Sequence, residues 1–199
     1  SAQSLDKNLE EGELTITQKP LSNACSGASR GNAAISHLML HFCSDAYQNP
    51  QNPYDLERIT GIFEQYKVSA HYLIDREGNS FQLVNENRVA YHAGKGKLKK
   101  APFHQNSLNS RSIGIEIMAV GEREEMKKLI PYSVYDKIDK ENIGFTEAQY
   151  ESLTNLVDDI VKRNPKILKN RDHIVGHDEY APTRRCDPGV LFEWDKIGL

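Results

Sequence analysis

The chain has 199 residues, of which 38% are hydrophobic and 27% are charged, and these proportions predict one domain around a single core. Its formal net charge is -3, so the chain lacks the excess of basic residues typical of proteins that bind phosphate backbones, and no nucleic acid is expected as a partner. No apolar run approaches the roughly 20 residues that cross a bilayer, so no membrane span is expected. The three cysteines, Cys25, Cys43 and Cys186, lack CxxC spacing and predict at most one disulfide bond.

Residues 1–33 are polar and show little periodicity, so they are expected to form an N-terminal lead with at most one edge strand, over 14–17. The folded domain is then expected to cover residues 34–199. From Ile35 to Cys43 the sequence ISHLMLHFC is too continuously apolar for a strand with one exposed face. It predicts a core strand covered on both sides.

A helix is expected to open at Asn52-Pro53, because the apolar residues that follow recur at the three- and four-residue spacing of one helical face. These apolar residues are Leu56, Ile59, Phe63 and Tyr66. Two β-prone runs, 70–75 and 80–84, are separated by a turn sequence that contains Gly78 and Asn79. These runs predict a β-hairpin.

Residues 112–118 alternate between two faces and predict another strand. One face carries three isoleucines, and the other carries Ser112, Gly114 and Glu116. The charged stretch 121–144 predicts irregular structure.

Thr146 and Gln149 form a capping-box signature at the start of a long amphipathic helix, which is expected to stop near Asn164-Pro165. A short strand over 173–176 and an irregular tail complete the chain. Strands interleaved with amphipathic helices predict a single-domain α/β fold with a central mixed β-sheet flanked by helices. A functional site is expected at the strand ends.

Histidine is the most informative residue type here, because three imidazoles or two with a carboxylate can hold a zinc ion. His37 and His41 are spaced for one face of a helix, but on the predicted strand four residues span roughly 13 Å, so the two cannot share a metal. His41 stands where the strand leaves the core and is the better candidate. A second cluster follows late in the chain, where His177 stands at the end of another predicted strand and Asp187 precedes the stiff turn Pro188-Gly189.

Six segments between about residues 35 and 195 closely resemble, in this order, the zinc-dependent N-acetylmuramoyl-L-alanine amidases of the type 2 amidase and peptidoglycan-recognition-protein superfamily. They are HFCSDA, VSAHYLIDREGNSFQLV, YHAG, NSRSIGIEI, FTEAQYESL and GHDEYAPTRRCDPG. The resemblance implies the amidase fold, with a zinc site in a groove at the strand ends, and makes residues 34–199 the catalytic domain.

The resemblance implies that His41, His177 and Asp187 hold one catalytic Zn²⁺. Two imidazoles and one carboxylate leave the fourth tetrahedral position for water, as a catalytic zinc requires. Some family members have a cysteine as the third ligand. Cys186 stands one residue before Asp187 and is interpreted as a neighbour of the site.

Two further residues are expected to act in catalysis. Glu116 lies among isoleucines, where an ionised carboxylate is costly without a partner or a task, and the resemblance makes it the general base. The alternative is a carboxylate held by a structural hydrogen bond. Some family branches use a tyrosine where Ala70 stands, which increases the weight on Glu116. Arg185 occupies the place of a lysine proposed to steady the oxyanion, and a surface arginine without a ligand is its alternative.

The resemblance also places His92 in the groove, as a residue that touches the muramyl or peptide part of the substrate. His71 is expected to be a packed, hydrogen-bonded strand residue rather than a ligand. Arg111 precedes the Glu116 strand and is expected to meet a substrate carboxylate, with a solvent-facing arginine as an equal alternative.

The activity that the resemblance implies is hydrolysis of the amide bond between the lactyl group of N-acetylmuramic acid and the L-alanine of the stem peptide. The expected partner is therefore peptidoglycan or a muropeptide. One alternative is a peptidoglycan-binding module on the same scaffold that does not cut. Another is a cysteine hydrolase that uses Cys43 beside His41.

The polar lead, the absent initiator methionine and a lysine-rich insertion favour a bacterial enzyme of the cell envelope or a secreted one, with the cytoplasm as the alternative. A monomer is expected, because nothing in the sequence requires a second copy.

Overall fold

The computed structural model describes residues 4–7 and 14–199. The strands are β1 (Ser4–Lys7), β2 (Leu14–Gln18), β3 (Ser26–Ser29), β4 (His37–Cys43), β5 (Tyr72–Ile74), β6 (Ser80–Gln82), β7 (Arg88–Ala90), β8 (Ser112–Met118) and β9 (Ile174–Gly176). The helices are α1 (Leu56–Tyr66), α2 (Arg123–Met126), α3 (Tyr132–Tyr135), α4 (Glu147–Arg163) and α5 (His177–Tyr180). Short 3-10 helices include η3 (Leu108–Arg111).

The main sheet has seven strands in the order β1-β2-β6-β5-β8-β4-β9. Strands β5, β8, β4 and β9 run parallel to one another, whereas β6 is antiparallel to β5 and β1 is antiparallel to β2. Strands β3 and β7 form a separate pair. The predicted mixed sheet is confirmed, and so is the hairpin formed by β5 and β6.

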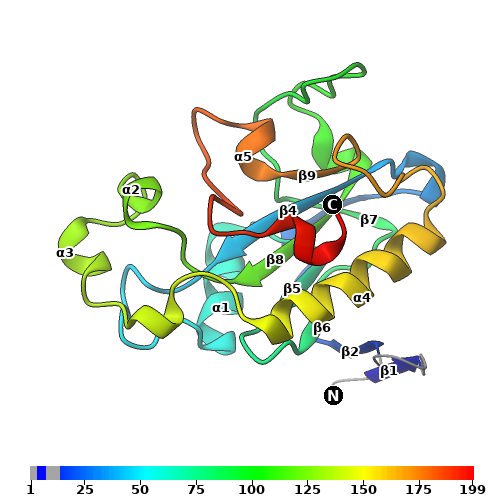
Figure 1. The fold of residues 1–199 in the computed structure, drawn as a ribbon. Coiled ribbons are helices and arrows are strands. Elements are labelled where there is room, and N and C mark those ends of the chain that lie inside the picture. The colour runs from blue at the N-terminus through cyan, green and yellow to red at the C-terminus, as the bar shows by residue number, and fades with distance from the viewer. Residues whose placement is uncertain (1–3, 8–13) are drawn as a thin grey trace.

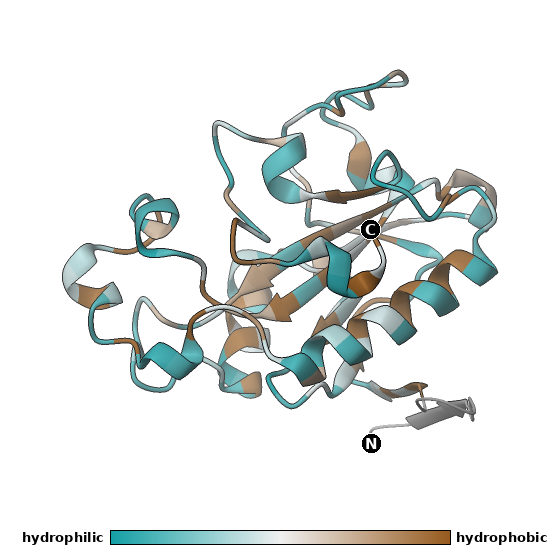
Figure 2. Cartoon of the chain, in the orientation of Figure 1, coloured by the Kyte–Doolittle hydropathy of each residue, from teal (hydrophilic) through white to brown (hydrophobic). Residues whose placement is uncertain are grey.

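Helix α4 runs along one face of the main sheet (Figure 1). The three isoleucines of β8 pack on this side with Leu153, Leu156 and Ile160 of α4. Hydrophobic residues concentrate on β4 and β8 and recur in bands along α4 (Figure 2). Helix α1 packs its Ile59 and Phe63 on the other face against β5 and β8. Met39 of β4 packs on that face with Leu98, Leu108 and Tyr180, so β4 is covered on both sides as predicted.

Both long helices begin at a capped residue. The predicted capping box of α4 is present, with Gln149 N donating to Thr146 Oγ1 at 3.1 Å, and the helix ends before Asn164 as expected. The start predicted for α1 at Asn52-Pro53 is wrong by a few residues. Asp55 is the N-cap, because its carboxylate accepts from Arg58 N at 2.9 Å. Tyr66, predicted on the buried face, is 67% exposed.

The polar N-terminal lead contributes more to the sheet than its composition indicated. The strand expected over 14–17 is present as β2, but β1 lies outside it, so β2 is not the edge. Leu14, Ile16 and Cys25 are buried. The division of the chain at residue 33 stays a prediction, although residues 14–33 clearly pack on the rest of the domain.

The stretch 121–144, expected to be irregular, contains α2 and α3. Its buried apolar residues form a small core of their own with Ala46 and Val120, and these residues are Met126, Ile130, Tyr135 and Ile138. The same stretch carries Leu129 to the edge of the site described below.

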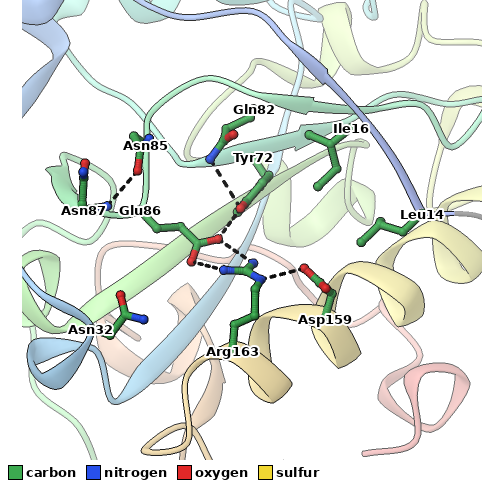
Figure 3. A pocket seen from close by; sticks show the side chains of 10 residues that line it. All are labelled: Leu14, Ile16, Asn32, Tyr72, Gln82, Asn85, Glu86, Asn87, Asp159 and Arg163. Carbon is green, nitrogen blue, oxygen red and sulfur yellow. Dashed lines mark hydrogen bonds and ion pairs between the residues drawn. The ribbon is translucent and has the colours of Figure 1, made fainter. Parts of the chain in front are cut away.

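A polar network joins the loop after β6 to α4 (Figure 3). Arg163 donates two hydrogen bonds of 2.9 Å to the carboxylate of Glu86, and Tyr72 donates a third to the same group. Asp159 accepts from Arg163 Nε at 2.8 Å. These groups line a cavity of about 310 Å³, and because they satisfy one another the network is a structural tie.

All three cysteines are free thiols, so the single disulfide that the sequence allowed is not formed. Within the described part of the chain, no helix is both long enough and apolar enough to cross a membrane.

Candidate active site

The candidate site lies on the face of the sheet away from α4. Strands β4 and β8 are parallel neighbours, and their register sets His41 beside Glu116. Strand β9 pairs with the other side of β4, and His177 begins α5 directly after β9. Because parallel strands end at the same edge of a sheet, residues far apart in sequence meet here. Asp187 comes from the loop that follows α5, where its carbonyl accepts from Asp178 N at 2.8 Å.

Three potential metal ligands converge at this edge. Nδ1 of His41 lies 3.0 Å from Nδ1 of His177 and 2.9 Å from Oδ2 of Asp187. The same oxygen is 3.2 Å from Nδ1 of His177. All three residues are buried, and their ligand atoms lie within 4.8 Å of one another. Two imidazoles and one carboxylate are a donor set for a divalent metal with an open coordination position.

The protonation of these groups fits a metal ion. Nε2 of His177 lies 2.8 Å from the carbonyl oxygen of Ala93, which can only accept, so Nε2 carries the ring proton. In the neutral form of this ring, Nδ1 then turns a lone pair toward Asp187 and His41. Burial, with the nearby His177, lowers the pKa of His41 to about 4, so this imidazole is neutral at pH 7. Lone pairs and a carboxylate that face one point without a proton between them call for a cation there.

Asp187 is the negative member of this group. Burial alone would raise the pKa of its carboxyl, but the ring nitrogens of His177 and His41, 3.2 and 2.9 Å from Oδ2, outweigh burial and hold the pKa below its ordinary range. Asp187 is thus ionised at neutral pH, in the state that a metal ligand needs.

Glu116 differs from Asp187 in its surroundings. Its Oε1 lies 3.9 Å from Nδ1 of His41, and its Oε2 is buried without a hydrogen-bond partner. Burial, followed by the negative charge of Asp187, raises the pKa of Glu116 well above its ordinary value. A carboxyl group with a raised pKa and a free oxygen beside a metal-capable cluster is suited to accept and release a proton.

These groups open into a cavity of about 260 Å³. Arg185 lies on its wall with its side chain exposed, and its positive charge acts on Glu116 and His41. The apolar part of the lining is Phe42, Phe63, Val68, Tyr91 and Leu129. The cavity thus combines a metal-capable cluster, a carboxyl and a guanidinium with apolar walls, as enzyme sites commonly do.

The remaining histidines differ in their surroundings. His71 is fully buried, and its Nδ1 accepts from Gly114 N at 3.1 Å, so it is a hydrogen-bonded structural residue. His37 stacks on His173 with 5.0 Å between ring centroids and lies outside the cluster. His92 does line the cavity, but its Nδ1 is 2.9 Å from Nε2 of His41.

Arg111 is not brought to this cavity. It ends η3 just before β8, whereas Glu116 lies five residues further along the chain, roughly 16 Å away. Its side chain is exposed, and its charge acts on His104 instead. The geometry therefore favours the alternative of a solvent-facing arginine.

The cysteines offer no second chemistry at the site. Cys43 shares a face with His41, but both ring nitrogens of His41 already have partners in His177, Asp187 and His92. Burial, together with Glu116, raises the pKa of Cys43 well above its ordinary value, so its thiolate is disfavoured. Cys186 is outside the metal-capable group and packs beside the core of the 121–144 stretch.

Sequence reasoning missed three residues that shape the site. Ser112 hydrogen-bonds His92 at 3.0 Å, and Asn109 accepts from the backbone of His92 and Ala93 at 3.1 and 2.8 Å. The polar face of β8 was a signal for Ser112, since it shares that face with Glu116. Asn109 opens the segment NSRSIGIEI, but its role was not recognised, and no pattern pointed to Leu129.

Comparisons with known proteins agree with this geometry. The chain is 33% identical over 174 residues to the 1,6-anhydro-N-acetylmuramyl-L-alanine amidase AmpD of Haemophilus influenzae, and the match covers 81% of this chain and 80% of that protein. The crystal structure of a selenomethionine AmpD derivative has the same fold, with a TM-score of 0.65 and 24% identity over 90% of this chain and 92% of that chain.

A further solved structure is that of the Escherichia coli amidase AmiD in complex with anhydro-N-acetylmuramic acid-L-Ala-D-γ-Glu-L-Lys. It is similar with a TM-score of 0.61 and 26% identity, over 96% of this chain and 64% of that chain. The family model of N-acetylmuramoyl-L-alanine amidases matches residues 31–190, and the chain therefore belongs to this family.

Proposed function

We propose that this protein is a zinc-dependent amidase that cleaves the bond between the lactyl group of N-acetylmuramic acid and the L-alanine of a peptidoglycan stem peptide. Family membership and the named relatives support the reaction class. The observation that carries the proposal is the convergence of His41, His177 and Asp187 beside Glu116, whose Oε2 is buried and unpartnered.

The residues divide the chemistry among themselves. When bound by His41, His177 and Asp187, Zn²⁺ supplies a Lewis acid that polarises the scissile carbonyl and acidifies water. Glu116 takes the proton from the attacking water and later delivers it to the leaving amine of L-alanine. The guanidinium of Arg185 stabilises the negative charge that develops on the carbonyl oxygen.

The raised pKa of Glu116 suits this double task. A carboxylate with an ordinary pKa is a weak base at neutral pH, whereas burial makes Glu116 a stronger base and its conjugate acid a better match for an amine leaving group. The unpartnered Oε2 is free to accept the proton.

The substrate class is peptidoglycan or the muropeptides released from it. The name of the Haemophilus influenzae relative and the ligand of the AmiD structure both contain an anhydromuramyl group, so anhydromuropeptides belong in the first substrate panel. A monomer stays a prediction. So does a location in the envelope or outside the cell, with the cytoplasm as the alternative, and fractionation of cells that express the natural gene tests it.

The deciding experiment incubates zinc-loaded protein with intact sacculi, reducing-end muropeptides and anhydromuropeptides, and identifies the products by mass spectrometry. We expect free stem peptides that begin with L-alanine. Chelator treatment should abolish their release, and added Zn²⁺ should restore it. Release that survives complete metal removal would favour the cysteine hydrolase, and binding of sacculi without any release would favour the non-catalytic module.

A further inference from the structure

The segment from Tyr91 to Gly94 contacts both imidazoles of the metal-capable cluster on the side away from the metal position. The Ala93 carbonyl accepts from Nε2 of His177 at 2.8 Å, and Nδ1 of His92 lies 2.9 Å from Nε2 of His41. Asn109 Oδ1 anchors this segment, because it accepts from the backbone N–H groups of His92 and Ala93.

The contact with His92 continues as a chain of hydrogen bonds. Nε2 of His92 lies 3.0 Å from Oγ of Ser112, and that hydroxyl donates to the carbonyl oxygen of Leu108 at 2.7 Å. Ser112 is fully buried and His41 is 1% exposed, so water does not compete at either end of the chain.

The carbonyl oxygen of Leu108, at the end of this series of hydrogen bonds, fixes which atom donates in each of them. The Leu108 carbonyl has no proton, so Ser112 must donate to it, and Oγ of Ser112 is then free to accept from Nε2 of His92. A proton on Nε2 of His92 leaves its Nδ1 as an acceptor, which in turn requires the proton of His41 to sit on Nε2. Nδ1 of His41 is thereby left with its lone pair, and this is the atom that faces Asp187 and His177.

The backbone of β8 makes room for this arrangement. A Cβ atom at Gly114 would lie 2.6 Å from Cγ of His92, so any other residue would displace the imidazole. The polar face of β8 therefore supports the site at three successive positions: Ser112 orients His92, Gly114 admits its ring, and Glu116 stands beside His41.

We propose that His92 is a positioning residue, which together with Ser112 selects the Nε2-protonated tautomer of His41 and presents Nδ1 of His41 to the metal. This inference rests on the proposed role of His41 as a metal ligand and deepens it. It replaces the expectation that His92 acts chiefly by touching substrate. Outer hydrogen-bond partners of histidine ligands typically change metal affinity by roughly 10- to 100-fold.

The first test needs no variant. In metal-free protein labelled with ¹⁵N, the imidazole nitrogen shifts report which ring atom is protonated. We expect the proton on Nε2 in both His41 and His92. Protonation of His92 on Nδ1, or of His41 on Nδ1, would overturn the proposal whether or not the protein hydrolyses any substrate.

The second test compares His92→Asn with His92→Leu, two side chains of similar size. Asparagine sets an amide oxygen near the place of Nδ1 and keeps an acceptor for His41, whereas leucine removes it. In competition with a chromogenic chelator and without substrate, the leucine variant should bind Zn²⁺ roughly 10- to 100-fold more weakly, and the asparagine variant should stay close to wild type. Equal affinities for the leucine variant and wild type would refute the positioning role.

Two readouts separate this role from others. A residue that only touches substrate would raise KM and leave zinc affinity unchanged, whereas the leucine variant at saturating Zn²⁺ should recover most of its kcat with little change in KM. If the leucine variant fails to fold, the ¹⁵N shifts of His92 in Ser112→Ala test the same chain of hydrogen bonds. Loss of the Ser112 acceptor should let His92 populate both tautomers, and a single unchanged tautomer would count against the chain.

Discussion

Replacement of Glu116 by glutamine changes the fewest atoms at the centre of the site and has opposite expected effects on turnover and stability. The side chain keeps its size and its place on β8, and all three potential metal ligands remain. What disappears is a group that can take a proton. The contact of 3.9 Å between Oε1 and His41 Nδ1 places the carboxylate within reach of a water molecule on the metal side of the cluster.

The kinetic magnitude follows from this position. A well-placed general base contributes roughly 100- to 10,000-fold, or about 2.7 to 5.4 kcal/mol of the activation barrier. We expect E116Q to lose turnover within this range and to retain KM and zinc affinity. The acid limb of the wild-type pH profile, where Glu116 becomes protonated and activity falls, should disappear from the residual activity of the variant.

Whereas E116Q should lower turnover, it should not lower the stability of the metal-free protein. Burial raises the pKa of Glu116 in the folded protein, so the folded state holds this proton more tightly than the unfolded state does. The ionised carboxylate therefore opposes folding once the pH exceeds the unfolded value of about 4.3. In metal-free protein at pH 7, E116Q should be at least as stable as wild type, and this difference should vanish below about pH 4.

Two measurements decide the matter. Mass-spectrometric product release gives turnover of the zinc-loaded proteins, and thermal unfolding of the chelator-treated proteins at pH 7 and pH 4 gives the stability difference. Turnover within tenfold of wild type would remove Glu116 from its role as base. A fall in Tm of several degrees at pH 7 would show that the carboxylate is structural, which is the alternative that the sequence left open.

Four further substitutions test the surroundings of the site and two positions away from it. Gly114→Ala should push the His92 ring aside and weaken zinc affinity in chelator competition. The control is Gly61→Ala, in an open position of α1, which should leave zinc affinity unchanged and raise the free energy of unfolding in urea by about 0.5 to 1 kcal/mol. Equal zinc affinity in both variants would contradict the close packing at Gly114. Arg185→Ala should lower kcat by roughly 10- to 1,000-fold at unchanged zinc affinity, and normal turnover would leave Arg185 without a catalytic role. Arg111→Ala should keep turnover within about twofold in the same assay, because Arg111 lies away from the cavity, and a large rise in KM would restore it as a substrate-binding residue.

Much of the fold could be predicted because periodicity reports which side of an element is buried. The alternation in 112–118 correctly separated the isoleucine face of β8 from the face with Glu116, and the capping box located the start of α4. The apolar run before His41 correctly predicted a strand covered on both sides. Periodicity was less informative where burial is intermittent, as in 14–33 and 121–144, whose apolar residues are too scattered to form one continuous face.

The sequence alone determined which residue types are available for chemistry and, through the order of the family motifs, which of them belong together. It could not determine how they touch. The contact of His92 with His41 joins residues 51 positions apart, and the placement of Glu116 beside His41 depends on the register of the parallel strands β4 and β8. Local pattern carries no information about that register, because it is set by the packing of the whole sheet against α1 and α4.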